Sequence, residues 1–182
     1  FPLIFNALTV LFIYFAGRRF ISNWAGITAS GLFIFSFYHF FYGLEARTYS
    51  LVSLGTAASL YYFLRYATDQ SDKKALAGLI LSNSVLVYSH HFGWFVIFSQ
   101  TLTSLFYIRS RKSFFRFVIP PLATLIVFSP MIPVIVKQFI SKSNRGTWLQ
   151  PPRPIDYMHE LYYFLNSKEV FYAIIIMLGA GI

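Results

Sequence analysis

Residues 45–49 hold an acidic, a basic and a phenolic side chain between two long apolar runs. Glu45, Arg47 and Tyr49 occupy every second position of this segment. We expect a helix to begin at Leu44, so that Arg47 lies at its positive dipole end, where a cation is unfavourable unless an anion binds there. Free helix N–H groups and a guanidinium both suit a phosphate. The sequence therefore predicts an anion site at Arg47.

A structural role for the same residues stays open. Glu45 and Arg47 could neutralise each other or charges on other helices, although i,i+2 positions lie on nearly opposite helix faces. A direct pair would therefore require Glu45 to lie in the turn before the helix. Tyr49 either orients the Glu45 carboxylate or is an interfacial aromatic residue, which is common in membrane proteins.

Two further segments carry side chains that suit polar ligands. His90 and His91 are adjacent, so they lack the i,i+4 spacing of a helical metal pair, but an imidazole can donate to a phosphate or sugar hydroxyl or carry a proton. Arg145 and Trp148 belong to a proline-rich connection. Trp stacks on sugar rings and also anchors proteins at the bilayer surface, so both interpretations stay open. Interfacial histidines bonded to backbone are the structural alternative for His90 and His91.

The elements that would position these groups are apolar helices. The chain of 182 residues is 57% hydrophobic, 21% aromatic and 12% charged. A soluble domain of this length does not hide so much apolar surface. We predict an all-α polytopic transmembrane bundle with helices over residues 1–16, 23–41, 44–67, 76–88, 92–108, 117–136 and 170–182. Asp156 is predicted to cap a short interfacial helix through Leu165, inside the long connection.

The distribution of basic residues predicts an orientation. Short cytoplasmic loops are enriched in Lys and Arg. With residues 18–19 inside, the alternate loops place nine basic residues inside, against Arg47 alone in the short outside loops and five in the connection over residues 137–169. The polar candidates of all three segments then face the extracytoplasmic side. This bias accounts for most of the net charge of +9, and the dispersed basic residues exclude nucleic acid as a partner.

Two features limit the kinds of site and the extent of the chain. The sequence has no cysteine, which excludes disulfides and thiolate metal sites within it. It opens on Phe1 without a basic leader and stops within an apolar run. We expect residues 1–182 to be one internal fragment of a larger multi-pass protein, truncated at both ends.

Three motifs, in this order, resemble a known family. They are GLEARTYSL at residues 43–51, YSHHFG at residues 88–93 and WLQPP at residues 148–152. The set is similar to the middle of the GT-C-fold glycosyltransferases of family 39, which are related to dolichyl-phosphate-mannose protein mannosyltransferases, and to the bacterial aminoarabinose transferases. The similarity covers nearly all of the chain. Each motif is short, and their order and spacing carry the resemblance.

The resemblance implies transfer of a sugar from a polyprenyl-phosphate donor to a protein, lipid or glycan acceptor. It implies a multi-pass protein of a prokaryotic plasma membrane with its active face extracytoplasmic. The family's catalytic carboxylate belongs to an earlier loop, expected upstream of Phe1, so no catalytic residue is assigned here. Arg47 would contact the donor phosphate, and the other substrate-binding candidates are Glu45, Tyr49, His90, His91, Arg145 and Trp148. The family often has His-Tyr where this chain has His90 and His91.

Two other functional classes remain as alternatives. A transporter or flippase of a lipid-linked or anionic solute would also use Arg47 near the membrane boundary, but transporters usually show paired broken helices and sites near the bilayer midplane. A non-catalytic membrane scaffold would leave the outside polar residues without a role. The sequence identifies no cofactor and no metal site, and it leaves a divalent metal requirement open.

Overall fold

The structure, a computed structural model, describes residues 1–37, 39, 41, 48–142, 153–164 and 167–179. The regular elements in these ranges are all helical. The α-helices are α1 (Pro2–Phe20), α2 (Asn23–Ile34), α4 (Tyr49–Thr68), α5 (Lys73–Ser89), α6 (Gly93–Ser104), α7 (Arg111–Phe128), α8 (Ile132–Lys142), α9 (Pro154–Phe164) and α10 (Lys168–Gly179). Two short 3₁₀ turns, η1 (Leu105–Tyr107) and η2 (Ser129–Met131), follow α6 and α7.

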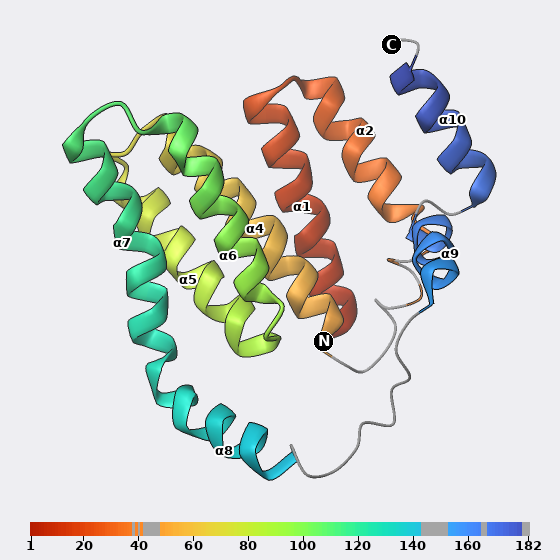
Figure 1. Ribbon diagram of the computed structural model, residues 1–182. Helices are drawn as coiled ribbons and strands as arrows, with labels where there is room; N and C mark the ends of the chain where they lie inside the picture. The colour runs from red at the N-terminus through yellow and green to blue at the C-terminus, as the bar shows by residue number, and fades with distance from the viewer. Residues whose placement is uncertain (38, 40, 42–47, 143–152, 165–166, 180–182) are drawn as a thin grey trace.

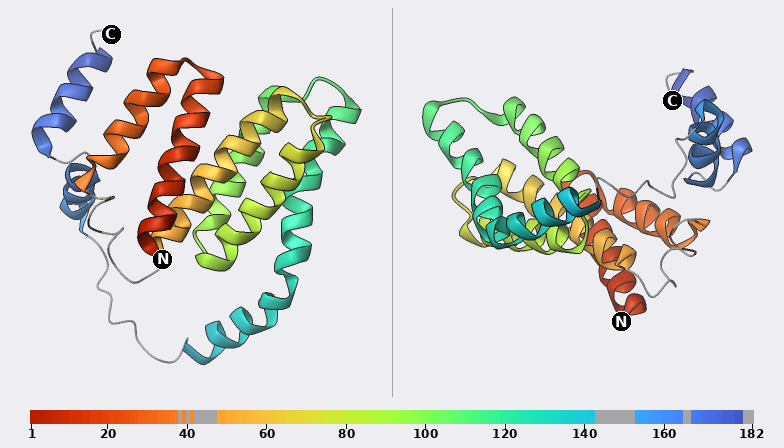
Figure 2. Two further views of the ribbon diagram at one scale, coloured as in Figure 1. Left: turned by 180° about the vertical axis from the view of Figure 1, so that it is seen from behind. Right: turned by 60° about the horizontal axis from the view of Figure 1, so that its bottom comes forward.

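The first six of these α-helices form an up-and-down arrangement. Helices α1, α4 and α6 run upward in Figure 1, whereas α2, α5 and α7 run downward between them. Helix α4 packs against both α1 and α5, and α5 packs against α7. Helices α9 and α10 pack on each other through the rings of Tyr162, Phe171 and Tyr172, apart from the α4–α7 layer (Figure 2).

A close approach of two glycines fixes the α1–α2 hairpin. A Cβ atom on Gly17 would lie 2.6 Å from the Gly26 Cα, and one on Gly26 would lie 2.6 Å from the Tyr14 carbonyl oxygen. Larger residues would therefore push the two helices apart. Ser22 caps α2 by accepting a hydrogen bond from the Ala25 N–H at 3.0 Å.

Many polar side chains are buried in the interior of the bundle, and many large apolar side chains are exposed on its surface. Buried polar side chains include Thr9, Ser59, Asn83, Gln100 and Thr124. Among the described residues, far more large hydrophobic side chains are exposed than buried. Helix interfaces in membranes favour small and polar residues, because lipid solvates large apolar side chains as well as a protein core does. The pattern therefore fits an apolar environment.

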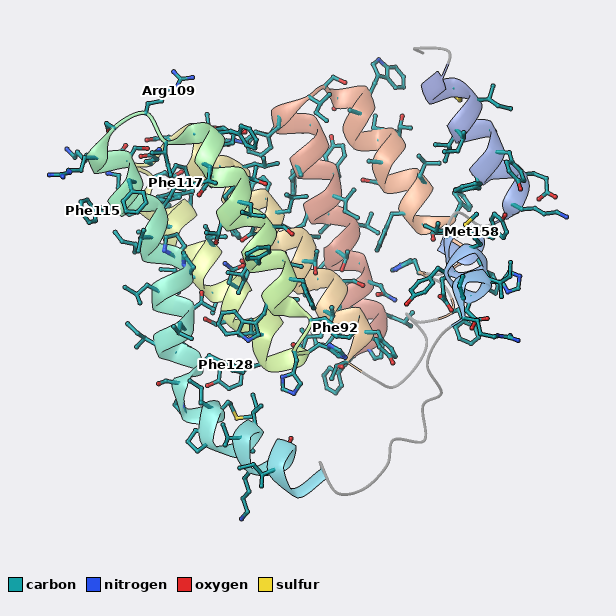
Figure 3. The ribbon with its side chains drawn as sticks, in the orientation of Figure 1. Phe92, Arg109, Phe115, Phe117, Phe128 and Met158 are labelled. Atoms are coloured by element: carbon teal, nitrogen blue, oxygen red, sulfur yellow. The ribbon has the colours of Figure 1, made fainter. Side chains whose placement is uncertain are left out.

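Two small apolar clusters complete the core, one at each end of α5. The upper cluster consists of Phe63, Tyr66, Ala67, Ala75, Leu79 and Phe117. The lower cluster consists of Val87, Ile97 and Phe128. Figure 3 shows Phe117 and Phe128 at opposite ends of α7, so these clusters join α7 to the bundle along most of its length.

The all-helical fold class is confirmed, but the predicted helix boundaries differ from the structure at several places. Helix α1 continues to Phe20, α5 begins earlier at Lys73, and the helix predicted over residues 117–136 is replaced by α7, η2 and α8. Helix α2 ends at Ile34 rather than at residue 41. At 12 residues it is about 18 Å long, which is too short to cross about 30 Å of hydrocarbon.

Two helical stretches of the described residues are long and apolar enough to cross a membrane. They are Pro2–Phe20, with 19 residues, and Arg111–Gln138, with 28 residues. These stretches support membrane association by length and composition. The predicted bundle of about seven spanning helices goes beyond this observation, and its multi-pass character remains a proposal.

Asp156 has a different place from the one predicted. Helix α9 begins at Pro154, so Asp156 lies inside its first turn rather than before it. The Asp156 carboxylate accepts a hydrogen bond from the Arg153 backbone N–H at 2.7 Å and lies 3.3 Å from the Arg153 guanidinium. Asp156 therefore stabilises the helix start from its third position, as the acidic member of a capping box does.

Candidate functional site

The start of α4 and the turn between α5 and α6 lie at the same end of the bundle. Gly55 of α4 approaches Leu86 of α5, because a Cβ atom on Gly55 would lie 3.2 Å from the Leu86 Cβ. At about 1.5 Å per residue, Tyr49 is roughly 9 Å below Gly55 and His90 roughly 6 Å below Leu86. Figure 3 labels Phe92 at this lower end. The structure thus brings Tyr49, His90 and His91 to one end, as the sequence predicted for their loops.

The turn that holds the two histidines is tightly hydrogen bonded. The Gly93 N–H donates to the His90 carbonyl at 2.9 Å, and the Phe92 N–H donates to His90 Nδ1 at 3.2 Å. Because His90 Nδ1 accepts a hydrogen bond, the proton of the neutral ring lies on Nε2, which is the atom left to face a ligand. His91 is exposed, whereas His90 is half-buried.

Packing of α7 supports this end of the bundle. The Tyr88 hydroxyl donates to the Val127 carbonyl at 2.8 Å, and the Trp94 and Phe128 rings meet edge to face at 5.3 Å. Trp94 follows the histidine turn directly, so the C-terminal end of α7 and the histidine turn are held together.

Four of the seven predicted site residues lie outside the described residues. These are Glu45, Arg47, Arg145 and Trp148. Helix α4 begins at Tyr49, with Thr48 as its N-cap residue, and Arg47 precedes this helix by two positions in the chain. A pairing of Glu45 with Arg47, or a contact between Arg47 and His90, therefore stays a prediction.

The opposite end of the bundle is strongly basic. It gathers the C-terminal ends of α1 and α4 and the N-terminal ends of α5 and α7, and Figure 3 labels Arg109 there. The nine basic residues of this end are Arg18, Arg19, Arg65, Lys73, Lys74, Arg109, Arg111, Lys112 and Arg116. Its acidic residues Asp69 and Asp72 belong to the α4–α5 connection, where Asp72 pairs with Arg65 at 2.6 Å.

Three buried amide and hydroxyl side chains form a closed network that sequence reasoning missed. Ser59 of α4 donates to Asn83 Oδ1, Gln100 Nε2 of α6 donates to Ser59 Oγ, and Asn83 Nδ2 of α5 donates to Gln100 Oε1 at 3.4 Å. This polar triad of Ser59, Asn83 and Gln100 ties three helices together. An amide inside each of two apolar runs, at positions 83 and 100, was the available sequence signal.

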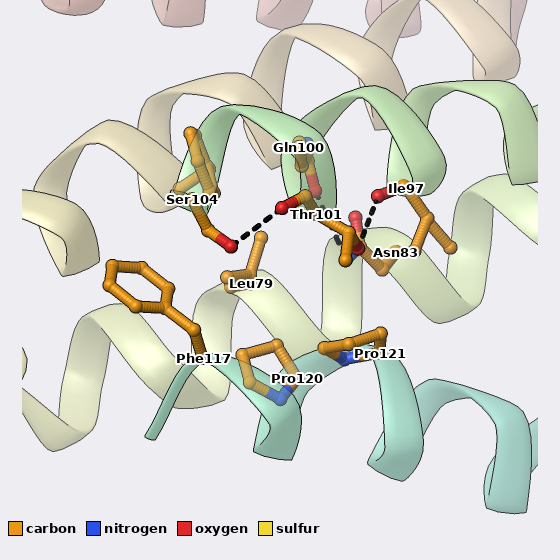
Figure 4. A pocket seen from close by; sticks show the side chains of 10 residues that line it. Leu79, Asn83, Ile97, Gln100, Thr101, Ser104, Phe117, Pro120 and Pro121 are labelled. Carbon is orange, nitrogen blue, oxygen red and sulfur yellow. Dashed lines mark hydrogen bonds between the residues drawn. The ribbon is translucent and has the colours of Figure 1, made fainter. Parts of the chain in front are cut away.

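A small cavity adjoins the polar triad. Asn83, Gln100 and Ser104 line it together with Phe117, Pro120 and Pro121 (Figure 4). Its volume of about 10 Å³ is close to the minimum for a single water molecule. The triad therefore holds helices together in a nearly solid interior and leaves no room for a larger substrate there.

Neither a metal centre nor a relative identifies the site. Within the described ranges, no group of three or more His, Cys, Asp or Glu side chains is placed to hold a metal ion. Comparison of the chain with protein-family models, curated proteins and solved structures gave no match. Only the residues and their arrangement therefore bear on the function.

Proposed function

We propose that the protein is a membrane glycosyltransferase that moves a sugar from a polyprenyl-phosphate donor to an acceptor at the extracytoplasmic face. The observation that supports this proposal is the separation of the two ends of the bundle. Tyr49 and the histidine turn lie at the end opposite the nine basic residues. Since basic residues favour the cytoplasmic side, this polar end faces outward.

In the proposed reaction, Arg47 binds the phosphate of the donor. A guanidinium next to the first amides of α4 stabilises the negative charge that develops on the departing polyprenyl phosphate. His90 presents Nε2–H as a further donor to the phosphate or to a sugar hydroxyl. Arg145 and Trp148 contact the acceptor or the sugar. The resemblance to the family assigns activation of the acceptor to a carboxylate that has no counterpart in this chain.

The described helices favour this proposal over transport. Helices α4 and α5 continue without a break past the polar triad, and the hydrogen bonds of the triad are made within the protein. A transport site near the middle of the bundle would need broken helices or open polar groups at this level.

The test is sugar transfer by the full-length protein in proteoliposomes, with a polyprenyl-phosphate sugar as donor. We expect Arg47→Ala to lower the rate about 100-fold or more, because a lost charge stabilisation in the transition state costs several kcal/mol. Arg111→Ala, a matched substitution of an exposed arginine at the opposite end, leaves the rate unchanged. Equal transfer rates for Arg47→Ala and the parent protein would refute the assignment of Arg47.

A further inference from the structure

An apolar groove lies on the side of the bundle between α1, α2 and α4. Its volume is about 540 Å³, within the range of ligand-binding clefts. Small residues line it, among them Ala16, Gly17, Ala29 and Ala57, together with larger apolar side chains such as Leu60 and Leu64. The close approach of α1 and α2 at Gly17 and Gly26 fixes the width of its α1–α2 side.

The groove has the length of one acyl chain in one leaflet. Along α4 it extends from Ala57 to Thr68, which is about 16 Å at 1.5 Å per residue. This length is about half the hydrocarbon thickness of roughly 30 Å. The groove therefore covers one leaflet, and it is the leaflet at the basic end of the bundle.

Polar and basic groups gather where the groove reaches this end. Thr68 and Tyr107 line the mouth. The exposed Arg19 guanidinium lies 5.9 Å from the ring centre of Phe20, a lining residue. A phosphate at the mouth would therefore meet this cationic side chain.

Other charges near the mouth are already engaged. Arg65 pairs with Asp72, and the Arg18 guanidinium donates to the Tyr14 hydroxyl at 3.3 Å. Asp69 follows Thr68 and opposes the positive charge, while its carboxylate accepts hydrogen bonds from the backbone and side chain of Ser71. Arg19 is an exposed cation that lies against a ring of the groove lining, so it is the residue expected to select an anionic headgroup.

We propose that this groove binds one anionic phospholipid, with an acyl chain between α1, α2 and α4 and the headgroup phosphate at Arg19. The apolar lining, the one-leaflet length and the basic mouth all fit this class of lipid. The site is separate from the proposed donor site, because it opens at the opposite end of the bundle. It therefore stands independently of the proposed sugar transfer.

The test is native mass spectrometry of the full-length protein released from nanodiscs that contain equal amounts of phosphatidylglycerol and phosphatidylcholine with matched acyl chains. We expect one retained lipid, with phosphatidylglycerol favoured about tenfold. The binding free energy of one hydrogen bond to a charged group corresponds to a preference of this size. Arg19→Gln removes the preference, whereas Lys74→Gln, at the same basic end but on α5, keeps it.

Filling the groove tests the acyl-chain part of the proposal. Ala57→Leu occupies the groove and abolishes retention of the lipid, whereas Ala77→Leu, an exposed position of α5 outside the groove, does not. Unchanged helical circular dichroism of both variants verifies that the fold is intact.

Several outcomes would overturn the proposal. Equal retention of the two lipids by the parent protein would exclude headgroup recognition. Inorganic phosphate could also be added to the parent protein. If it abolished the preference for phosphatidylglycerol while phosphatidylcholine stayed bound in the groove, the basic residues would form a phosphate site that does not select lipids. A dimer of the parent protein that Ala57→Leu dissociates would assign the groove to a second copy of the chain.

Discussion

At the residue scale, the described part of the chain holds a closed hydrogen-bond network in its interior. The polar triad satisfies a serine, an asparagine and a glutamine among apolar helices. Each side chain contributes from a different helix, so the triad fixes how α4, α5 and α6 are rotated relative to one another. A buried polar group that loses its partner is costly, which makes the network specific for this packing.

The triad yields a matched pair of serine substitutions. Ser59→Ala removes the fully buried hydroxyl that links the two amides of the triad. We therefore expect a loss of about 1 kcal/mol in the free energy of unfolding. Ser99→Ala, on the exposed side of α6, removes a hydroxyl that bonds to the Phe95 carbonyl of its own helix, and we expect a change below about 0.5 kcal/mol. Unfolding in mixed detergent micelles measures both. Equal effects would mean that the triad has no particular role in stability.

For the described site residues, the sequence predicted only which loops lie on the same side. The alternation of predicted helices and loops placed Tyr49 and the histidines on one side, and α4 and α5 bring them to one end of the bundle. The hydrogen bond from the Phe92 N–H to His90 Nδ1 was not predictable, since it depends on the local turn geometry after α5. The triad was missed because Asn83 and Gln100 interrupt apolar runs without any spacing that signals a partner.

At the element scale, the α1–α2 hairpin depends on glycine for a steric reason. Gly26→Ala would place a Cβ atom 2.6 Å from the Tyr14 carbonyl oxygen, so the helices must separate, and we expect a loss of about 1–3 kcal/mol. Gly31→Ala lies in the same helix with no atom within 4 Å of the new Cβ, so the better helix propensity of alanine is expected to add about 0.5–1 kcal/mol. Thermal unfolding of the two variants in detergent checks the opposite signs. A loss of stability in both would indicate that α2 needs glycine for another reason.

The connection between α4 and α5 carries a pH-dependent contribution to stability. Asp72 caps α5 by accepting from the Ala75 N–H at 2.9 Å, and this hydrogen bond, followed by the pair with Arg65, holds the pKa of the Asp72 carboxyl below its ordinary value of 3.8. A lowered pKa in the folded state means that the contribution is fully present above the ordinary pKa and disappears as the pH falls through the lowered one.

Asp72→Asn isolates this contribution, because asparagine keeps an acceptor for the cap but has no charge. We expect the variant to be less stable than the parent near neutral pH, and the difference to vanish as the pH falls below the lowered pKa of Asp72. Unfolding midpoints of both proteins from about pH 7 to about pH 2 measure this difference. A difference that does not change with pH would show that the charge of Asp72 has no part in it.

The helix boundaries show where the sequence was insufficient. Apolar runs predicted the helices, but they did not reveal that α2 ends at Ile34 or that Pro130 and Pro133 accompany a change of direction between α7 and α8. Hydropathy averages over a run, whereas a local change of hydrogen bonding marks the end of α2. The Ser36 N–H donates to the Phe33 carbonyl, three residues back, at 3.2 Å. The connection between α4 and α5 lies in the gap between the helices predicted over residues 44–67 and 76–88. In the structure it is shortened to residues 69–72, where Asp69 and Asp72 stabilise a turn and a helix start.

At the scale of the whole molecule, charged and exposed apolar side chains occupy different parts of the bundle. Charge is concentrated at the upper end, where α4 meets α5 and α6 meets α7, while exposed apolar side chains cover the sides of the helices (Figure 3). We propose that the basic end faces the cytoplasm, because basic residues favour the cytoplasmic side and are attracted to its anionic leaflet. The proposed donor site and the proposed phospholipid groove would then serve opposite leaflets.

This orientation can be measured with single cysteines, since the sequence contains none. Ser71→Cys places an exposed thiol in the loop at the basic end, and Phe92→Cys places one in the histidine turn. A membrane-impermeant maleimide added to intact cells that express the full-length protein is expected to label Phe92→Cys at once and Ser71→Cys after permeabilisation. The parent protein gives the background, and equal stability of both variants excludes misfolding as the cause. Labelling of Ser71→Cys in intact cells, with Phe92→Cys protected, would reverse the orientation and put the histidine turn on the cytoplasmic side, where the proposed transfer does not take place.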